Sequence, residues 1–141
     1  MTTAAAFQYV VLRVVPRVER GECFNAGVVV FCRTKRYLAA RVELDEQRLR
    51  ALDPDADIAL LRNHLDALVR IAEGDRSAGA MAVLDASDRF GWLAAPSSTV
   101  IQCSPIHTGL STDPGETLER LFIALVRPLE GRTSKESSEK R

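Results

Sequence analysis

The first third of the chain alternates between apolar runs of strand length and short polar connections. Residues 7–15 (FQYVVLRVV) are rich in aromatic and β-branched side chains and end at Pro16, which predicts a β-strand. Both faces of this strand are largely apolar, and Arg13 interrupts one of them. Such a strand lies inside a sheet that is covered on both sides. A second apolar run, residues 23–32, follows the polar connection 16–22. The two runs therefore predict an antiparallel hairpin.

Two further strands are predicted from shorter patterns. Residues 37–44 alternate between apolar and more polar side chains, and this period of two is typical of a strand near the sheet edge, with one wetter face. Residues 99–103 (TVIQC) predict a fourth strand, which Pro105 interrupts. We expect residues 107–109 to form a turn that leads to Asp113.

Two main helices are predicted from apolar residues at helical spacing. Asp53-Pro54 combines an N-cap acceptor with a proline at the first helical position, and the stripe that follows continues until Gly74. A capping box with an internal proline, residues 113–116, begins the last helix, and Pro128 ends it. These signals predict helices over roughly 54–73 and 114–127.

The fold class follows from this order of elements. Asp45 is predicted to cap a short helix, and residues 75–95 have a weaker pattern. We predict a single α+β domain over residues 1–130, an antiparallel sheet of about four strands with two main helices packed against it. Residues 131–141 are mostly Ser, Lys and Glu, which predicts a disordered tail.

The charge balance argues against nucleic-acid binding. Lys plus Arg and Asp plus Glu are both 19, so the chain as a whole has no electrostatic attraction to nucleic acid or anionic lipid. Five basic residues flank the first hairpin but divide between opposite ends of its strands: Arg17, Arg20, Arg33, Lys35 and Arg36. They form no continuous stripe, and we expect no nucleic acid among the partners.

Neither a membrane segment nor a metal centre is expected. No stretch approaches the roughly 20 apolar residues that cross a bilayer, and residues 1–6 lack the pattern of a signal peptide. The three cysteines form no C-x-x-C pair and the chain has two histidines, so reduced thiols in a cytoplasm explain the cysteines better than a disulfide framework or a zinc site. We predict a cytoplasmic protein without metal or cofactor.

One candidate site is built around Arg13. If the hairpin loop is centred near Val18 and Glu19, Arg13 lies opposite Phe24 or Asn25. The two polar side chains need partners, because an unpaired buried polar group costs roughly 1–3 kcal/mol. Glu22 could supply a carboxylate to Arg13. Gly27 is predicted on the same face as Asn25, where it would leave room for a ligand.

A second polar cluster runs through the fourth strand, and it shares a face with the first cluster if that strand pairs with residues 7–15. It contains Ser97, Ser98, Thr99, Gln102, Ser104, His107 and Thr108. The predicted ligand- or partner-binding residues of both clusters are Arg13, Glu22, Asn25, Gln102, Ser104, His107 and Thr108.

Structural roles are an alternative for the same residues. Arg13 could tie the sheet to a loop, Asn25 could hydrogen-bond within the sheet, and His107 could cap a turn. Gly-rich phosphate loops and hydrolase or metalloprotease motifs are absent from the sequence. We therefore favour a non-enzymatic accessory or binding module. The alternative is a small enzyme or ligand-binding domain for an anionic or nucleotide-like ligand, in which Arg13 clamps the anion and His107 moves a proton.

The sequence also resembles a known family. Residues 9–31 show an arginine in the first strand, a closing proline and the pattern G-E-x-x-N-x-G-V-V, and residues 90–110 contain a second block, Q-x-S-P-x-H-T-G. Both are similar to the bacterial family catalogued as domain of unknown function 3037. The resemblance implies an α+β fold without an established activity. It also suggests a partner, a HipA-like kinase homologue, because such homologues are often encoded beside family members.

Overall fold

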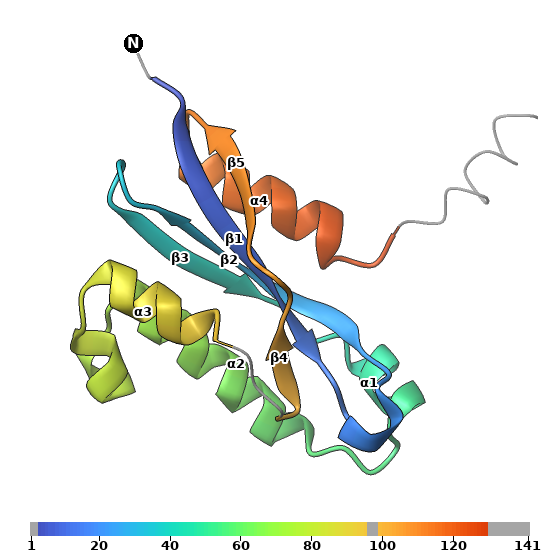
Figure 1. Cartoon of the computed structure of the whole chain (residues 1–141). Coiled ribbons are helices and arrows are strands. Elements are labelled where there is room, and N and C mark those ends of the chain that lie inside the picture. The colour runs from blue at the N-terminus through green and yellow to red at the C-terminus, as the bar shows by residue number, and fades with distance from the viewer. Residues whose placement is uncertain (1–2, 96–98, 130–141) are drawn as a thin grey trace, which may run out of the picture.

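The computed structural model describes residues 3–95 and 99–129, and in this part of the chain an antiparallel sheet lies between helices (Figure 1). Its strands are β1 (Ala5–Val14), β2 (Phe24–Cys32), β3 (Tyr37–Val42), β4 (Ile101–Cys103) and β5 (His107–Ser111). Its α-helices are α1 (Glu46–Leu52), α2 (Ile58–Glu73), α3 (Ala86–Leu93) and α4 (Pro114–Leu125). Single 3-10 turns cover Val18–Arg20, Arg76–Ala78 and Ala80–Val83. The predicted α+β class is confirmed.

β1 is the central strand of the sheet, whose order is β3-β2-β1-β4. β4 pairs with Leu12–Val14 and β5 with Ala5–Tyr9 of the same strand. Because β2 occupies the other side of β1, β4 and β5 together form one interrupted edge. Residues 107–109 are thus part of a strand, and the predicted turn is wrong. The chain resumes pairing with β1 after Pro105, which lacks an N–H but disrupts the strand only locally.

The hydrophobic core is divided by the sheet into two layers. On one face, β1 and β2 pack against α1, α2 and α3, with Leu12, Leu49 and Leu65 almost fully buried. On the other face, Val28 and Val30 of β2 pack against α4. The helix residues of this second layer are Leu118, Phe122 and Val126. β1 is apolar on both sides because helices cover both faces of the sheet at its centre.

A β-bulge sets the register of the hairpin. Arg13 pairs with Asn25, whereas Leu12 pairs with Gly27, so that Ala26 is the extra residue of β2. The bulge places Gly27 opposite Leu12 on the α2 face, while Asn25 lies with Arg13 on the α4 face. The prediction that Gly27 shares a face with Asn25 is therefore wrong. The space at Gly27 is filled, since a Cβ there would lie 2.8 Å from Cγ1 of Val42.

The helix caps follow the predicted chemistry with one correction. Asp45 and Asp113 cap α1 and α4 as predicted, and Gly74 ends α2 with a left-handed φ of 75°. Asp57 caps α2, because its carboxylate accepts the N–H of Leu60. Asp53 is instead the C-cap of α1. The residues that follow it form the turn between the two helices.

Candidate functional site

Three polar side chains form a row across the middle of the sheet. Arg13 of β1 lies opposite Asn25 of β2 on one side and opposite Gln102 of β4 on the other. Directly opposed residues of antiparallel strands share a face, and here it is the face that carries α4, since the side-chain amide of Asn25 donates to the carbonyl of Leu125 at 2.9 Å. We call Asn25, Arg13 and Gln102 the Arg13 row.

The two amides of the row are held by backbone groups. Asn25 is fixed to the end of α4, and Nε2 of Gln102 donates to the carbonyl of Thr99 at 3.0 Å. Arg13 is half-buried, and within residues 3–95 and 99–129 its guanidinium makes no hydrogen bond or ion pair. The row therefore contains a cation without a counter-ion between two oriented carboxamides.

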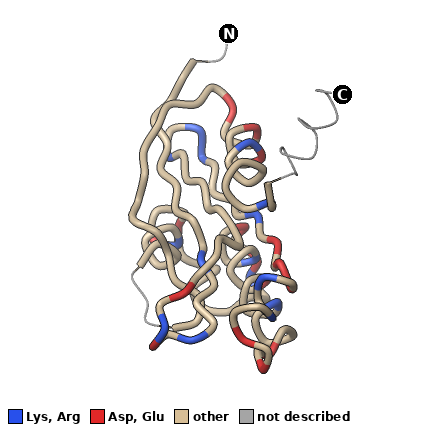
Figure 2. Tube along the Cα trace, turned by 90° about the vertical axis from the view of Figure 1, so that its right-hand side faces the viewer, with Lys and Arg blue, Asp and Glu red and all other residues tan. Residues whose placement is uncertain are grey.

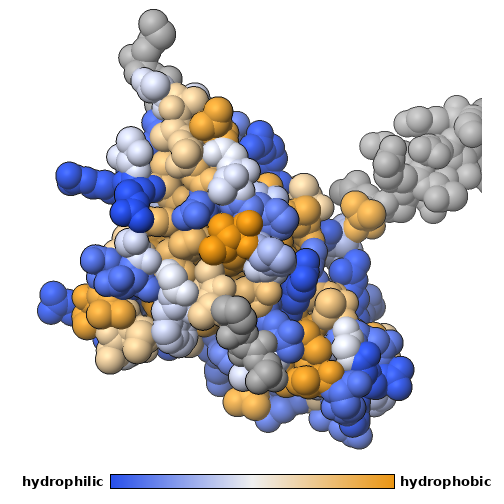
Figure 3. Space-filling model, viewed as in Figure 1, coloured by the Kyte–Doolittle hydropathy of each residue, from blue (hydrophilic) through white to orange (hydrophobic). Residues whose placement is uncertain are grey.

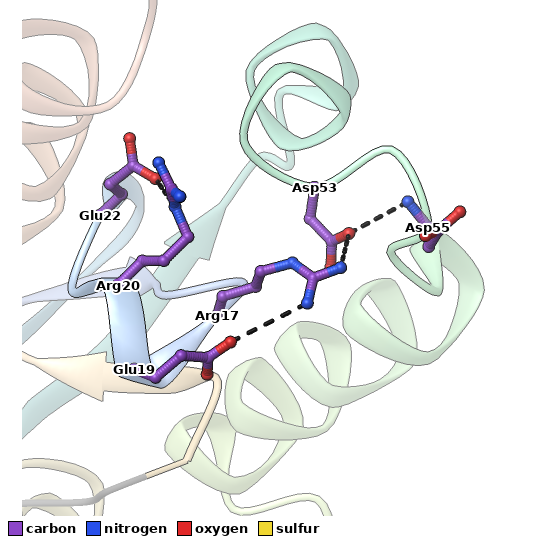
Figure 4. A network of polar contacts seen from close by, with 6 residues as sticks. All are labelled: Arg17, Glu19, Arg20, Glu22, Asp53 and Asp55. Carbon is purple, nitrogen blue, oxygen red and sulfur yellow. Dashed lines mark hydrogen bonds and ion pairs between the residues drawn. The ribbon is translucent and has the colours of Figure 1, made fainter.

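Glu22, the predicted carboxylate partner of Arg13, belongs to a different contact. Its Oε1 lies 2.5 Å from Nε of Arg20 (Figure 4), and this hydrogen bond raises the pKa of Arg20. The 3-10 turn Val18–Arg20 ends at Gly21 with a left-handed φ of 70°, which brings Glu22 back beside Arg20. Both side chains are exposed, so the pair contributes little to stability, and Glu22 does not join the Arg13 row.

The same loop carries an ion pair that the sequence did not reveal. Nη2 of Arg17 lies 3.3 Å from Oδ1 of Asp53, which also accepts the N–H of Asp55 at 3.0 Å (Figure 4). The contact connects the β1–β2 loop to the turn between α1 and α2. Its role is structural, since Asp53 is buried and satisfied by these two donors.

His107 shares the face of the Arg13 row but lies at a distance from it. It pairs with Tyr9, and the two rings stack with their centroids 5.0 Å apart. Tyr9 precedes Arg13 by four residues, which corresponds to about 13 Å along an extended strand. Val11 occupies the intervening position on this face. A shared catalytic site requires the imidazole and the Arg13 guanidinium to lie close together. The structure does not bring them together.

Ser104 has a structural role at the break in the sheet edge. Its hydroxyl accepts the N–H of Val11 at 2.9 Å, and its own N–H donates to the carbonyl of Val11 at 2.8 Å. The side chain thus replaces a backbone acceptor between β4 and β5. Thr108 pairs with Gln8 and lies exposed on the face opposite His107. Ser97 and Ser98 lie outside the described residues.

The chain matches a known family over most of its length. The family model of a protein of unknown function, DUF3037, matches residues 9–126. The chain belongs to the DUF3037 family. The match extends from β1 to the end of α4 and includes every residue of the Arg13 row. No curated protein and no solved structure matches the chain. In the described part of the chain, no helix is both long enough and apolar enough to span a membrane.

The DUF3037 domain also contains an apolar hollow that the sequence did not predict. It has a volume of about 310 Å³ and lies between α2, α3 and β4, with Leu68, Trp92 and Ile101 in its wall. Cys103 is also in the wall, but its thiol donates to the carbonyl of Leu93, and burial raises its pKa. The thiol is therefore poorly suited as a nucleophile.

Metal-ligating side chains do not gather in the described part of this DUF3037 chain. Among residues 3–95 and 99–129, no group of three or more His, Cys, Asp or Glu side chains is placed to hold a metal ion. The chemistry of the candidate site is thus that of a guanidinium and two carboxamides, which can bind an anion and donate or accept hydrogen bonds.

Proposed function

We propose that this protein is a non-enzymatic binding module, which holds an acidic side chain of a protein partner on the Arg13 row. One observation carries the proposal. Arg13 is half-buried, and its guanidinium has no hydrogen bond or ion pair in the described part of the chain, although the residue lies between Asn25 and Gln102. A carboxylate would accept two parallel N–H bonds from it, which is the pairing that arginine forms best.

The surrounding structure favours recognition over catalysis. The three residues of the row come from adjacent strands at the centre of a sheet that helices cover on both faces, and such a support keeps binding groups in a fixed arrangement. The candidate proton donor His107 is about four strand residues away, which is roughly 13 Å. The free thiol of Cys103 is engaged by a carbonyl.

The nature of the partner rests on the family resemblance. Because similar proteins are often encoded beside HipA-like kinase homologues, we propose a protein of that kind, acting in a bacterial cytoplasm, as the partner. The carboxylate that it supplies would be exposed on its surface in the free state and would become partly buried against Arg13.

The test is affinity purification from a lysate of the source organism. The wild-type protein is compared with Arg13→Gln, which removes the charge but retains polar atoms, and with Arg76→Gln as a control at an exposed arginine. Circular dichroism establishes that both variants are folded. We expect one protein to be captured by the wild type and by Arg76→Gln and to be lost with Arg13→Gln. Equal capture by all three would refute a role of Arg13 in partner binding.

A small anion is the second candidate occupant, favoured by the same unpaired guanidinium. Inorganic phosphate is the probe, and the measured quantity is the melting temperature of wild type and of Arg13→Gln. A saturable increase in Tm that depends on Arg13 would favour a ligand-binding domain. The protein-partner proposal instead predicts equal and non-saturating effects of phosphate on the two proteins.

A further inference from the structure

The apolar hollow between α2, α3 and β4 lies on the face of the sheet opposite the Arg13 row, since α2 and α3 cover one face and α4 covers the other (Figure 1). Its floor is the buried side chain of Leu12 in β1. One wall is formed by His64 and Leu68, which are four residues apart and share a face of α2. Trp92, near the end of α3, stands in another wall. We call this space the Trp92 hollow.

The surroundings of the Trp92 hollow are uncharged. Among the described residues that line it, none is Lys, Arg, Asp or Glu, and residues 90–112, which include the end of α3 and all of β4 and β5, contain none either. Figure 2 shows the charged residues on other segments of the chain. In Figure 3, many strongly hydrophilic side chains lie toward the outline of the molecule, with apolar and weakly polar ones nearer its middle. An ionic ligand would lose its hydration in the hollow without gaining a counter-charge, so a neutral, largely apolar occupant is favoured.

Two side chains in the wall are available to such an occupant. Trp92 is 43% exposed, and among the described residues its indole stacks on no other aromatic ring. A flat ring that packs on the indole would cover this exposed apolar surface. His64 is exposed and makes no hydrogen bond or ion pair within the described part of the chain. Its imidazole can therefore exchange a hydrogen bond with one polar group of the occupant.

We infer that the Trp92 hollow binds a neutral, flat molecule of two fused aromatic rings that carries one hydroxyl or similar polar group. The size follows from the volume of about 310 Å³, which is twice that of a cavity of about 150 Å³ that holds one benzene ring. In this arrangement the rings contact Leu68 and Trp92, and the polar group reaches His64. Apolar walls with a single convergent polar group are the usual composition of a small-molecule site.

An NMR titration of the ¹⁵N-labelled full chain with 2-naphthol tests the inference. Trp92 is the one tryptophan of the chain, so its indole N–H gives a single signal, and the expected result is a saturable shift of that signal. A wild type that shows no saturable shift would overturn the inference. A shift produced by the captured partner protein but not by 2-naphthol would also overturn it, because it would assign the hollow to a protein side chain.

A filling variant locates the bound naphthol. Leu68→Phe narrows the hollow and is expected to lose the saturable shift. Leu60→Phe is the matched control, since Leu60 belongs to the same helix, is 62% exposed and does not line the hollow, and it is expected to bind like the wild type. Circular dichroism establishes that both variants are folded. Undiminished binding by a folded Leu68→Phe variant would show that the naphthol binds elsewhere and would refute the inference.

His64→Leu tests the polar contact and decides the question even if Leu68→Phe does not fold. It removes the imidazole from an exposed position but keeps an apolar side chain there. The affinity for 2-naphthol is expected to fall about 2–12-fold, which corresponds to one hydrogen bond, while the affinity for naphthalene stays the same. An equal change for the two compounds would contradict the arrangement. Arg13→Gln is expected to bind 2-naphthol normally, so the result does not depend on the partner-binding proposal.

Discussion

Replacement of Ser104 by alanine tests whether this side chain holds the interrupted edge to β1. Ser104 is 4% exposed and Val11 is 5% exposed, and the hydroxyl is the acceptor for the Val11 N–H at 2.9 Å. Ser104→Ala leaves this N–H buried without an acceptor, which costs about 1–3 kcal/mol. For a domain of this size the loss corresponds to a decrease in Tm of roughly 3–12 °C.

Urea denaturation followed by circular dichroism measures the loss in unfolding free energy. Thr108→Ala is the matched control, because it removes a hydroxyl from an exposed position of the same edge, and we expect it to change stability by less than about 0.5 kcal/mol. Hydrogen exchange gives a second readout, since the Val11 amide should exchange faster in Ser104→Ala. If the two variants were equally stable and the Val11 amide kept its protection, the assigned role of Ser104 would be wrong.

Three further predictions concern packing, thiol reactivity and the loop ion pair. Gly27→Ala should lower stability by about 1–3 kcal/mol through overpacking, because its Cβ would lie 2.8 Å from Val42. Gly91→Ala should raise stability by about 0.5–1 kcal/mol, since Gly91 lies in the middle of a helix and nothing would lie within 4 Å of the added Cβ. Thermal denaturation compares the two variants, and an equal effect on stability would contradict the packing at Gly27. Exposed Cys23 should react with a thiol reagent before Cys103, whose pKa is raised by burial, and mass spectrometry of the native protein would refute this by finding Cys103 modified first. Asp53→Ala should lower the free energy of unfolding by about 1–3 kcal/mol, and Asp53→Asn by less, because asparagine still accepts the Asp55 N–H. Equal losses of stability for the two variants in urea denaturation would show that the turn does not need that acceptor.

The strands and helices were predictable where a single local pattern determined them. β1 and β2 follow from continuous apolar runs, and Asp113-Pro114 identified the beginning of α4. The start of α2 was not predictable, because Asp53 and Asp57 are equally good capping residues. The choice between them depends on how far α1 extends, which is a matter of packing.

The candidate site was predictable only in its centre. Polar residues in apolar strands identified Arg13 and Asn25, and the hairpin geometry gave their pairing to within one residue. The partner of Glu22 depends on the left-handed turn at Gly21, and the position of β5 depends on pairing with a strand that lies about a hundred residues earlier. Such contacts are long-range and leave no local pattern.

The central claim is that Arg13, Asn25 and Gln102 together receive a carboxylate of a partner, and NMR of the ¹⁵N-labelled protein tests it most directly. The side-chain amide signals of Asn25 and Gln102 and the Nε–H signal of Arg13 are followed while the captured partner is added. The account predicts saturable shifts of all three signals, absent when the partner's contacting acid is neutralised. Shifts confined to other surfaces, with these three signals unchanged at saturation, would contradict it.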